Sequence, residues 1–193
     1  MEMKGEELIA ASRERVYEAL NDVEILKRCI PGCEEIEKTS ETEMTAKVVI
    51  KVGPVKAKFS GEITLSDLDP PTGYTISGQG KGGAAGFAKG SAKVRLEARG
   101  SDTVLHYEVH AQVGGKLAQI GGRLIDGTAR KLAGQFFTSF SAIVGSPEDG
   151  EAPAAAAPDS GQGQATGGPV RLIAWGAAAA IAAAIAAYLL LGG

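Results

Sequence analysis

The chain has 193 residues, with 20 Lys and Arg against 23 Asp and Glu, a formal net charge of −3 and two cysteines. A protein without a basic excess is a poor match for a nucleic-acid partner, and two cysteines cannot build the disulfide framework of a small secreted protein. Residues 1–145 contain 19 acidic and 19 basic side chains and are long enough for one domain with its own core.

The first 35 residues predict a strand and two short helices. Residues 1–10 alternate acidic and apolar side chains and lack the features of a secretory signal. Ser12 is a suitable N-cap for a helix through Val16 and Leu20, and a second helical piece ends at Pro31-Gly32. The spacing of Cys29 and Cys33 does not fit a Cys-x-x-Cys redox pair, and no second ligand pair is present for zinc.

Alternating side chains then predict a long antiparallel meander. The alternating runs are 44–52, 55–65, 74–76, 92–98 and 105–113, with turn signals at Gly53-Pro54 and 69–73. This pattern is typical of an antiparallel sheet with one solvent-facing and one covered face.

The cover for this sheet is expected from a helix over 116–144. Apolar residues recur there at helical spacing, namely Leu117, Ile120, Leu124, Leu132, Phe136, Phe140 and Ile143. The sequence therefore predicts an α+β helix-grip fold, in which a curved antiparallel sheet surrounds a long C-terminal helix.

Glycines occupy several positions on the covered face of the predicted sheet, and the covering helix carries glycines as well. Those of the sheet are Gly61, Gly78, Gly80 and Gly90, and those of the helix are Gly121, Gly122, Gly127 and Gly134. Two interpretations stay open: close helix–sheet packing or β-bulges, and an internal hollow in which a ligand replaces the missing side chains. The hollow would be an apolar cavity with two phenols as polar contacts. Its predicted lining is Phe59, Tyr74, Ile76, Gly78, Gly80, Phe87, Tyr107, Leu117, Ile120, Leu124, Phe136 and Phe140.

Three polar signals have simpler explanations than a cofactor site. In the glycine-rich stretch 78–90, Lys81 precedes Gly82 and a strand follows, whereas a phosphate loop requires a helix, so we expect no nucleotide but a loop or lid beside the cavity. His106 and His110 share a solvent-facing strand, where a solvated surface is the simpler explanation and we expect no metal. Lysines 47, 51, 56 and 58 protect a sheet edge or contact an anionic lipid or acidic partner.

The last 48 residues predict a linker and a membrane anchor. Residues 146–169 are rich in Ala, Pro, Gly, Gln and Ser, as in a solvated linker. The stretch from Leu172 to Leu191 carries no charge, and a 20-residue helix is about 30 Å long, which matches the bilayer core. Trp175 and Tyr188 lie near its two ends, where interfacial aromatic residues are found.

Ten of these 20 residues are alanine, so a packed Ala-rich helix is the alternative. We expect a single-pass transmembrane anchor over 170–193. Arg171 flanks the span on the domain side, which favours a cell-membrane protein with its domain on the cytoplasmic side.

Several motifs of the domain resemble the carbon monoxide dehydrogenase G-subunit family. They are 20–22 (LND), 28–33 (RCIPGC), 53–59 (GPVKAKF), 69–71 (DPP), 80–90 and 114–129 (GGKLAQIGGRLIDGTA). The resemblance implies a START/Bet v 1-like fold of the SRPBCC superfamily, with a hydrophobic cavity. It also implies association with a carbon monoxide dehydrogenase or related molybdenum hydroxylase at the membrane, and it carries over no catalytic residue.

The function expected on this basis is that of an accessory protein and not an enzyme. It would recruit the dehydrogenase to the membrane and bind a lipid quinone, with Tyr74 or Tyr107 as hydrogen-bond donor, to pass electrons to the respiratory chain. The alternative is a purely structural anchor with no functional ligand. A cyclase-type enzyme, also known in the superfamily, needs a titratable group that the inward positions do not offer beyond the two tyrosines.

Overall fold

The computed structural model describes residues 2–145, so the predicted linker and membrane segment lie outside the described residues. The strands are β1 (Glu2–Ile9), β2 (Cys33–Lys38), β3 (Glu43–Val52), β4 (Val55–Asp69), β5 (Gly73–Lys81), β6 (Phe87–Arg99) and β7 (Asp102–Gly114). The helices are α1 (Arg13–Ala19), α2 (Val23–Cys29) and α3 (Gly122–Val144), with short 3₁₀ turns η1 (Gly83–Ala85) and η2 (Ala118–Ile120).

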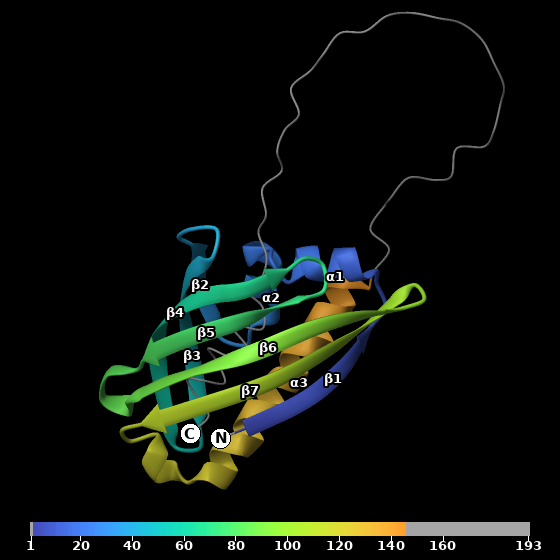
Figure 1. Ribbon diagram of the computed structural model, residues 1–193. Helices are drawn as coiled ribbons and strands as arrows, with labels where there is room; N and C mark the ends of the chain where they lie inside the picture. The colour runs from blue at the N-terminus through green and yellow to red at the C-terminus, as the bar shows by residue number, and fades with distance from the viewer. Residues whose placement is uncertain (1, 146–193) are drawn as a thin grey trace, which may run out of the picture.

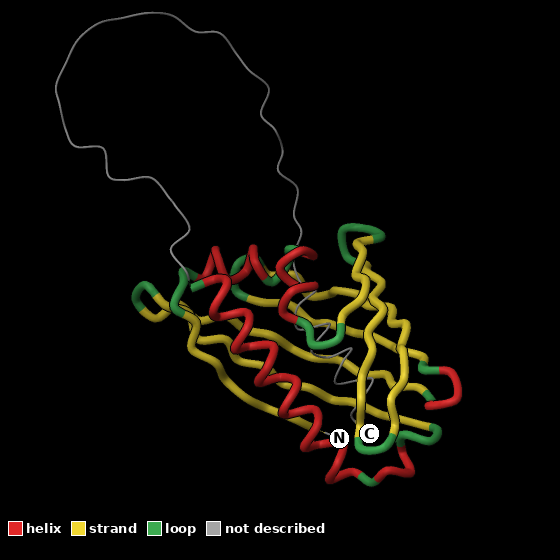
Figure 2. Tube along the Cα trace, turned by 180° about the vertical axis from the view of Figure 1, so that it is seen from behind, coloured by secondary structure: helices red, strands yellow, loops and turns green. Residues whose placement is uncertain are grey.

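The seven strands form one antiparallel sheet in the order β1-β7-β6-β5-β4-β3-β2. Strands β2 to β7 follow one another along the chain as a meander, and β1 pairs with β7 at the far edge. The sheet curves around α3, which crosses its inner face diagonally, while α1 and α2 lie together at one end (Figures 1 and 2). The predicted helix-grip architecture is therefore confirmed.

Local sequence explains most of the element boundaries. The Ser12 hydroxyl accepts the Arg15 N–H and caps α1, and the Asp22 carboxylate accepts two backbone N–H groups at the start of α2. Gly53 adopts a φ of 52° in the turn between β3 and β4, a left-handed conformation that glycine takes at little cost. The alternation over β3 and β4 places Val48 and Phe59 in the core as register partners.

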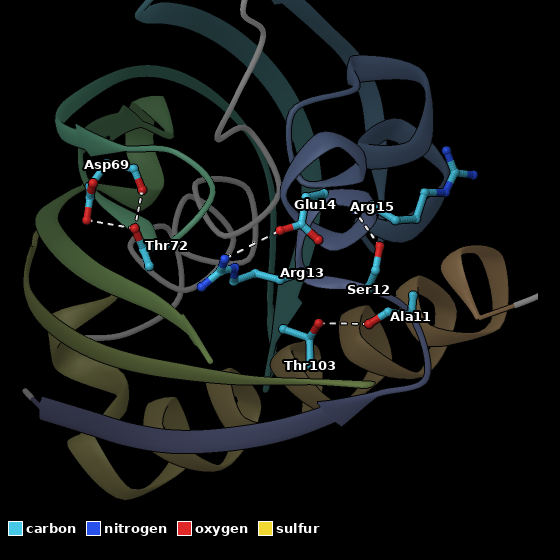
Figure 3. Close-up of polar contacts among 8 residues, drawn as sticks. All are labelled: Ala11, Ser12, Arg13, Glu14, Arg15, Asp69, Thr72 and Thr103. Atoms are coloured by element: carbon cyan, nitrogen blue, oxygen red, sulfur yellow. Dashed lines mark hydrogen bonds and ion pairs between the residues drawn. The ribbon is translucent and has the colours of Figure 1, made fainter. Parts of the chain in front are cut away.

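One end of the sheet is joined to the segment before α1 by a side-chain hydrogen bond (Figure 3). The Thr103 hydroxyl donates to the Ala11 carbonyl oxygen at 2.7 Å, which ties the start of β7 to the segment before α1. In the turn between β4 and β5 the Thr72 hydroxyl contacts the Asp69 carboxylate at 2.7 Å. At this end α1 lies against β6 and β7.

The covering helix differs from its prediction in phase and in length. Gly121 has a φ of 99°, and this left-handed residue separates η2 from α3, so the expected helix over 116–144 is interrupted. The buried stripe of α3 is Ile125, Ala129, Ala133, Phe136, Phe137, Phe140 and Val144. The glycines expected on the covering helix, Gly121, Gly122, Gly127 and Gly134, are all exposed, and a Cβ added at any of them would meet nothing within 4 Å.

No helix within residues 2–145 combines the length and the apolar character needed to cross a membrane. The predicted span from Leu172 to Leu191, with Trp175 and Tyr188, lies outside the described residues.

Candidate ligand-binding site

The inner face of the sheet carries two adjacent rows of glycine and alanine, which we call the small-residue rows. The first is Ala46, Gly61, Gly80 and Ala88, which are register partners across β3, β4, β5 and β6. The second is Gly78, Gly90 and Ala111, which are register partners across β5, β6 and β7. Seven neighbouring positions thus contribute at most one methyl group each to the inner face of the sheet.

Larger side chains follow on the same face, further from the turn between β5 and β6. Ile76 pairs with Ala92, and two residues on, Tyr74 pairs with Val94, which pairs in turn with Tyr107. From Gly80 to Tyr74 the strand advances about 20 Å. The inner face therefore changes along β5 from bare backbone to aromatic rings.

Tyr74 is a buried phenol, with 2% of its surface exposed. Its ring meets Tyr17 of α1 edge to face, with centroids 5.9 Å apart. Its hydroxyl has no hydrogen-bond partner among the described residues. A buried polar group left in this state costs about 1–3 kcal/mol, which makes it a place where a ligand acceptor would be favoured. Burial, and to a lesser degree Tyr17, raises the pKa of Tyr74 well above 10, so the phenol stays protonated as a donor.

Tyr107 is the more accessible of the two predicted phenols. Its ring stacks on Phe137 with centroids 5.4 Å apart, and it covers Gly5 of β1 so closely that a Cβ there would collide with it. Partial burial raises the pKa of Tyr107, the nearby Glu7 carboxylate adds to this, and Arg130 opposes it. Tyr107 therefore lies between the β1 edge and α3, and Tyr74 lies deeper.

Five further predicted lining residues are buried. Phe136 and Phe140 of α3 stack with centroids 5.6 Å apart, and Phe136 also meets Phe137 edge to face. Phe59 contacts the backbone at Gly82, and the Leu117 N–H donates to the Ala85 carbonyl oxygen at 3.0 Å. Ile76 is fully buried. The structure thus assembles these side chains with the two tyrosines in one core.

Of the three other predicted lining residues, Phe87 and Leu124 lie elsewhere and Ile120 lies at the margin of the core. Phe87 is wrong as a lining residue: it is 50% exposed, and its register partners Lys81 and Gly114 place it on the outer face of the sheet. Leu124 is 46% exposed, and it lies with Ile120 against Gly53 in the turn between β3 and β4. Ile120 of η2 is in addition partly buried against the core.

Two aromatic residues of the site are absent from the predicted lining. Phe137 lies on the buried stripe of α3 and stacks on Tyr107, and Tyr17 of α1 contacts Tyr74. Phe137 is detectable in principle, because residues 133, 136, 137 and 140 share one helical face. The contact of Tyr17 with Tyr74 depends on how α1 packs on the sheet, and no local sequence pattern specifies this packing.

The two histidines on the outer face are engaged with carboxylates. His110 lies 3.2 Å from Glu2 and 3.5 Å from Glu108, and His106 lies 3.5 Å from Glu6 and 3.6 Å from Glu97. In the part of the chain that the structure describes, no three His, Cys, Asp or Glu side chains are grouped as a metal site requires. Cys29 and Cys33 are both free thiols.

Comparison of the sequence with protein-family models identifies the family to which the chain belongs. The family model described as the G subunit of carbon monoxide dehydrogenase (CoxG) matches residues 5–145. The chain belongs to the CoxG family. This match covers the helix-grip domain, including the small-residue rows and both tyrosines, and its name implies association with carbon monoxide dehydrogenase.

Solved structures support the same fold for this CoxG domain. A conserved protein from Geobacillus kaustophilus is 32% identical, with a TM-score of 0.70, and the match covers 75% of this chain and 95% of that chain. A START superfamily protein from Mycobacterium smegmatis is 13% identical, with a TM-score of 0.58 and 74% and 96% covered. An aromatase/cyclase from Streptomyces sp. R1128 is 12% identical, with a TM-score of 0.53 and 75% and 93% covered.

The last two similarities concern the fold alone. Among curated proteins the sequence has no match. Because the Geobacillus kaustophilus chain consists almost wholly of the shared unit, this unit folds as a domain without a counterpart of residues 146–193.

Proposed function

We propose that this CoxG protein is a membrane-tethered accessory protein of a carbon monoxide dehydrogenase or a related molybdenum hydroxylase. It binds a lipid quinone between the sheet and α3 and so passes electrons from the enzyme to the respiratory chain. Family membership supports the partner, and the fold supports an apolar ligand. The observation that carries the ligand proposal is the buried, unpartnered hydroxyl of Tyr74 beyond the small-residue rows.

A quinone matches this inner face in two respects. Its isoprenoid tail requires an apolar surface with few protruding side chains, which Gly61, Gly80 and Gly90 provide. Its ring carbonyl requires one donor in an otherwise apolar place, which Tyr74 provides. The tail would then point along β5 toward the turn between β5 and β6.

Membrane tethering rests on the sequence beyond Gly145. The uncharged stretch from Leu172 to Leu191 is long enough for one span, and the 24 residues of 146–169 separate it from the domain. In this arrangement the span holds the domain near the bilayer, and the domain exchanges its ligand there.

A filling variant tests the ligand proposal against the close-packing interpretation. We expect Gly80→Val in the fragment 1–145 to reduce binding of menaquinone-4 or ubiquinone-2 at least tenfold, with little change in thermal stability, because the new side chain enters space that the ligand uses. If the rows instead pack tightly against α3, the same change overpacks the core and costs about 1–3 kcal/mol. Gly90→Val in the second row repeats the test at an independent position.

The same variant in the full chain separates a carrier from a structural anchor. A carrier with Gly80→Val keeps the dehydrogenase on the membrane but loses electron transfer to the quinone pool. An anchor without a functional ligand keeps both, and that outcome would contradict the proposal.

A further inference from the structure

The charges of this domain are sorted along its length, although the domain as a whole is formally neutral. One end is formed by three segments, 51–56, 81–87 and 114–124, which we call the basic end. These segments contain five cations and no acidic residue, namely Lys51, Lys56, Lys81, Lys116 and Arg123. All five side chains are exposed, and none forms an ion pair within residues 2–145.

The three segments form one surface. Ile120 and Leu124 contact the turn at Gly53, and the backbone of Leu117 is hydrogen-bonded to Ala85. Gly86 in turn lies against Gly114 and Gly115. In Figure 1 the corresponding turns and η2 gather at the lower end of the molecule, away from α1 and α2.

The opposite end carries the compensating charge. It consists of α1 and α2 with their flanking residues (12–29) and of the turns at 39–43, 66–72 and 99–102. These segments contain nine acidic residues, Glu14, Glu18, Asp22, Glu24, Glu41, Glu43, Asp67, Asp69 and Asp102, against five basic ones, Arg13, Arg15, Lys27, Arg28 and Arg99. Part of this end is seen in Figure 3 around Asp69 and Glu14. The domain is thus an electrostatic dipole along the sheet.

Apolar side chains are exposed at the basic end as well. Phe87 and Leu124 are two of the four large hydrophobic residues that the described part of the chain exposes. Phe87 lies next to Lys81 as its register partner, and Leu124 follows Arg123. An aromatic or aliphatic side chain beside cations is typical of a surface that lies in the headgroup region of an anionic bilayer.

The geometry points to a second membrane contact: we propose that the basic end docks on the surface of an anionic phospholipid bilayer, independently of the C-terminal span. The five cations face the lipid phosphates while Phe87 and Leu124 enter the headgroup region, and the acidic end points away. An acidic protein surface would satisfy the cations equally well, but the two exposed apolar side chains between them favour lipid.

This orientation has a consequence for ligand exchange. The small-residue rows begin at Gly80 and Ala88, next to the turn between β5 and β6, so they lie closer to the basic end than Tyr74 does. Docking would place this part of the inner face nearest to the bilayer. A lipophilic ligand would therefore move between the membrane and the domain over a short path.

Vesicle binding by the fragment 1–145 tests the proposal, because this fragment lacks the C-terminal span. Cosedimentation is measured with phosphatidylcholine vesicles and with vesicles that contain phosphatidylglycerol. We expect binding only to the anionic vesicles, and a marked loss of binding when the salt concentration is raised. The triple variant K51Q/K56Q/K81Q should lower the affinity about 100-fold, at roughly fivefold per removed cation.

The matched control is K27Q/K93Q/R99Q, which removes the same charge from exposed positions outside the basic end. We expect it to keep at least a third of the wild-type affinity, and both triple variants to keep the wild-type Tm. Phe87→Ser should weaken binding several-fold at constant charge. Equal losses in the two triple variants, or no binding of the wild type to anionic vesicles, would overturn the proposal.

A last experiment distinguishes an anionic bilayer from an acidic protein as the partner of the basic end. If the wild-type fragment ignores vesicles while K51Q/K56Q/K81Q in the full chain abolishes copurification with the dehydrogenase, the basic end is a protein interface and the lipid proposal is wrong. Quinone binding in detergent is unaffected by either result, so failure of this proposal is distinguishable from failure of the proposed carrier function.

Discussion

The Tyr74 ring meets the Tyr17 ring edge to face at an interplanar angle of 72°, and the Tyr74 hydroxyl is buried without a hydrogen-bond partner in the described part of the chain. The contact fixes the ring through α1, which leaves the hydroxyl at a defined position in the apolar interior. A buried hydrogen-bond donor that is held in place without an acceptor is typical of a binding site in which the ligand supplies the acceptor.

Tyr74→Phe should therefore stabilise the ligand-free domain and weaken the ligand-bound one. Removal of the unsatisfied hydroxyl is expected to raise the free energy of unfolding by about 1 kcal/mol, while quinone affinity falls about five- to tenfold through the lost hydrogen bond. Chemical denaturation and ligand titration of the fragment 1–145 measure both. Tyr107→Phe is the control and should change neither by as much, because that phenol is partly exposed. A Tyr74→Phe variant that binds quinone like the wild type would show that Tyr74 is not the donor.

The pH dependence of stability follows from the same residue. The folded state raises the pKa of Tyr17, Tyr74 and Tyr107, so above about pH 10 the unfolded chain releases protons that the folded chain retains. The contribution of these tyrosines to the free energy of unfolding is thus fully present below about pH 10. It falls as the pH rises further, by up to about 1.4 kcal/mol per pH unit for each such tyrosine. Tyr74→Phe should make the alkaline loss shallower by close to one proton, and an unchanged slope would contradict the assigned burial.

Replacement of the α3 glycines Gly127 and Gly134 by alanine is expected to raise the stability of the domain. A Cβ at Gly127 or Gly134 meets nothing within 4 Å, so Gly→Ala should stabilise the helix by up to about 1 kcal/mol at each site. Thermal denaturation of the two variants checks this. Gly82→Ala is the contrasting change, because its methyl group would collide with the Phe59 ring and should lower the Tm. If Gly127→Ala and Gly134→Ala are destabilising, these glycines face a packed surface after all.

The two free cysteines should differ in reactivity. Burial raises the pKa of the Cys29 thiol to about 11, so it is almost entirely protonated at pH 8 and also shielded. Cys33 is only half-buried, although burial raises its pKa too. Mass spectrometry after iodoacetamide treatment should find Cys33 alkylated well before Cys29, with Cys29 reacting at a comparable rate only in denaturant. Equal rates in the folded protein would contradict the packing of α2.

Linker length should control whether the basic end reaches the bilayer. Gly145 lies beside Ala10, and the 23-residue helix α3 places it about 34 Å from the start of that helix at the basic end. The 24 residues of 146–169 can extend to about 80 Å, whereas eight residues reach at most about 28 Å. In the full chain in anionic vesicles, a photo-crosslinker at Ala84 should label lipid, and deletion of 16 linker residues should abolish this labelling. Undiminished lipid labelling in the deletion variant would contradict either the proposed span or the docked orientation. The vesicle binding of the fragment 1–145, which lacks the span, tests the docking proposal by itself and so tells the two apart.

The sequence predicts the sheet well because alternation is a local property with a period of two. The runs through Val48, Phe59 and Ile76 keep the phase that burial requires, and Gly61, Gly78, Gly80 and Gly90 follow it. Strand β2 is not predicted, since Ile36 is its one buried side chain and the strand gives no alternation to detect.

The site is predicted less completely because helix phase and side-chain direction depend on tertiary contacts. Within α3 the helical phase makes Ile125 and Phe137 face the core in place of Leu124, because Ile125 lies about 20° around the helix from Phe136 and Leu124 about 120°. Phe87 is an aromatic residue and so suggests a cavity position, yet it has the opposite parity to Ala88 and Gly90 on the same strand. Strand parity outweighs residue type in such cases, because a one-residue offset moves a side chain to the other face.

The most direct test of the central claim is extraction of lipid from the fragment 1–145, expressed in a quinone-producing host and purified without detergent. Organic extraction followed by mass spectrometry should recover a lipid quinone in a ratio approaching one per domain, and Gly80→Val should lower this ratio at least tenfold. Repeated recovery of no quinone, together with no binding of added menaquinone-4 or ubiquinone-2, would contradict the account.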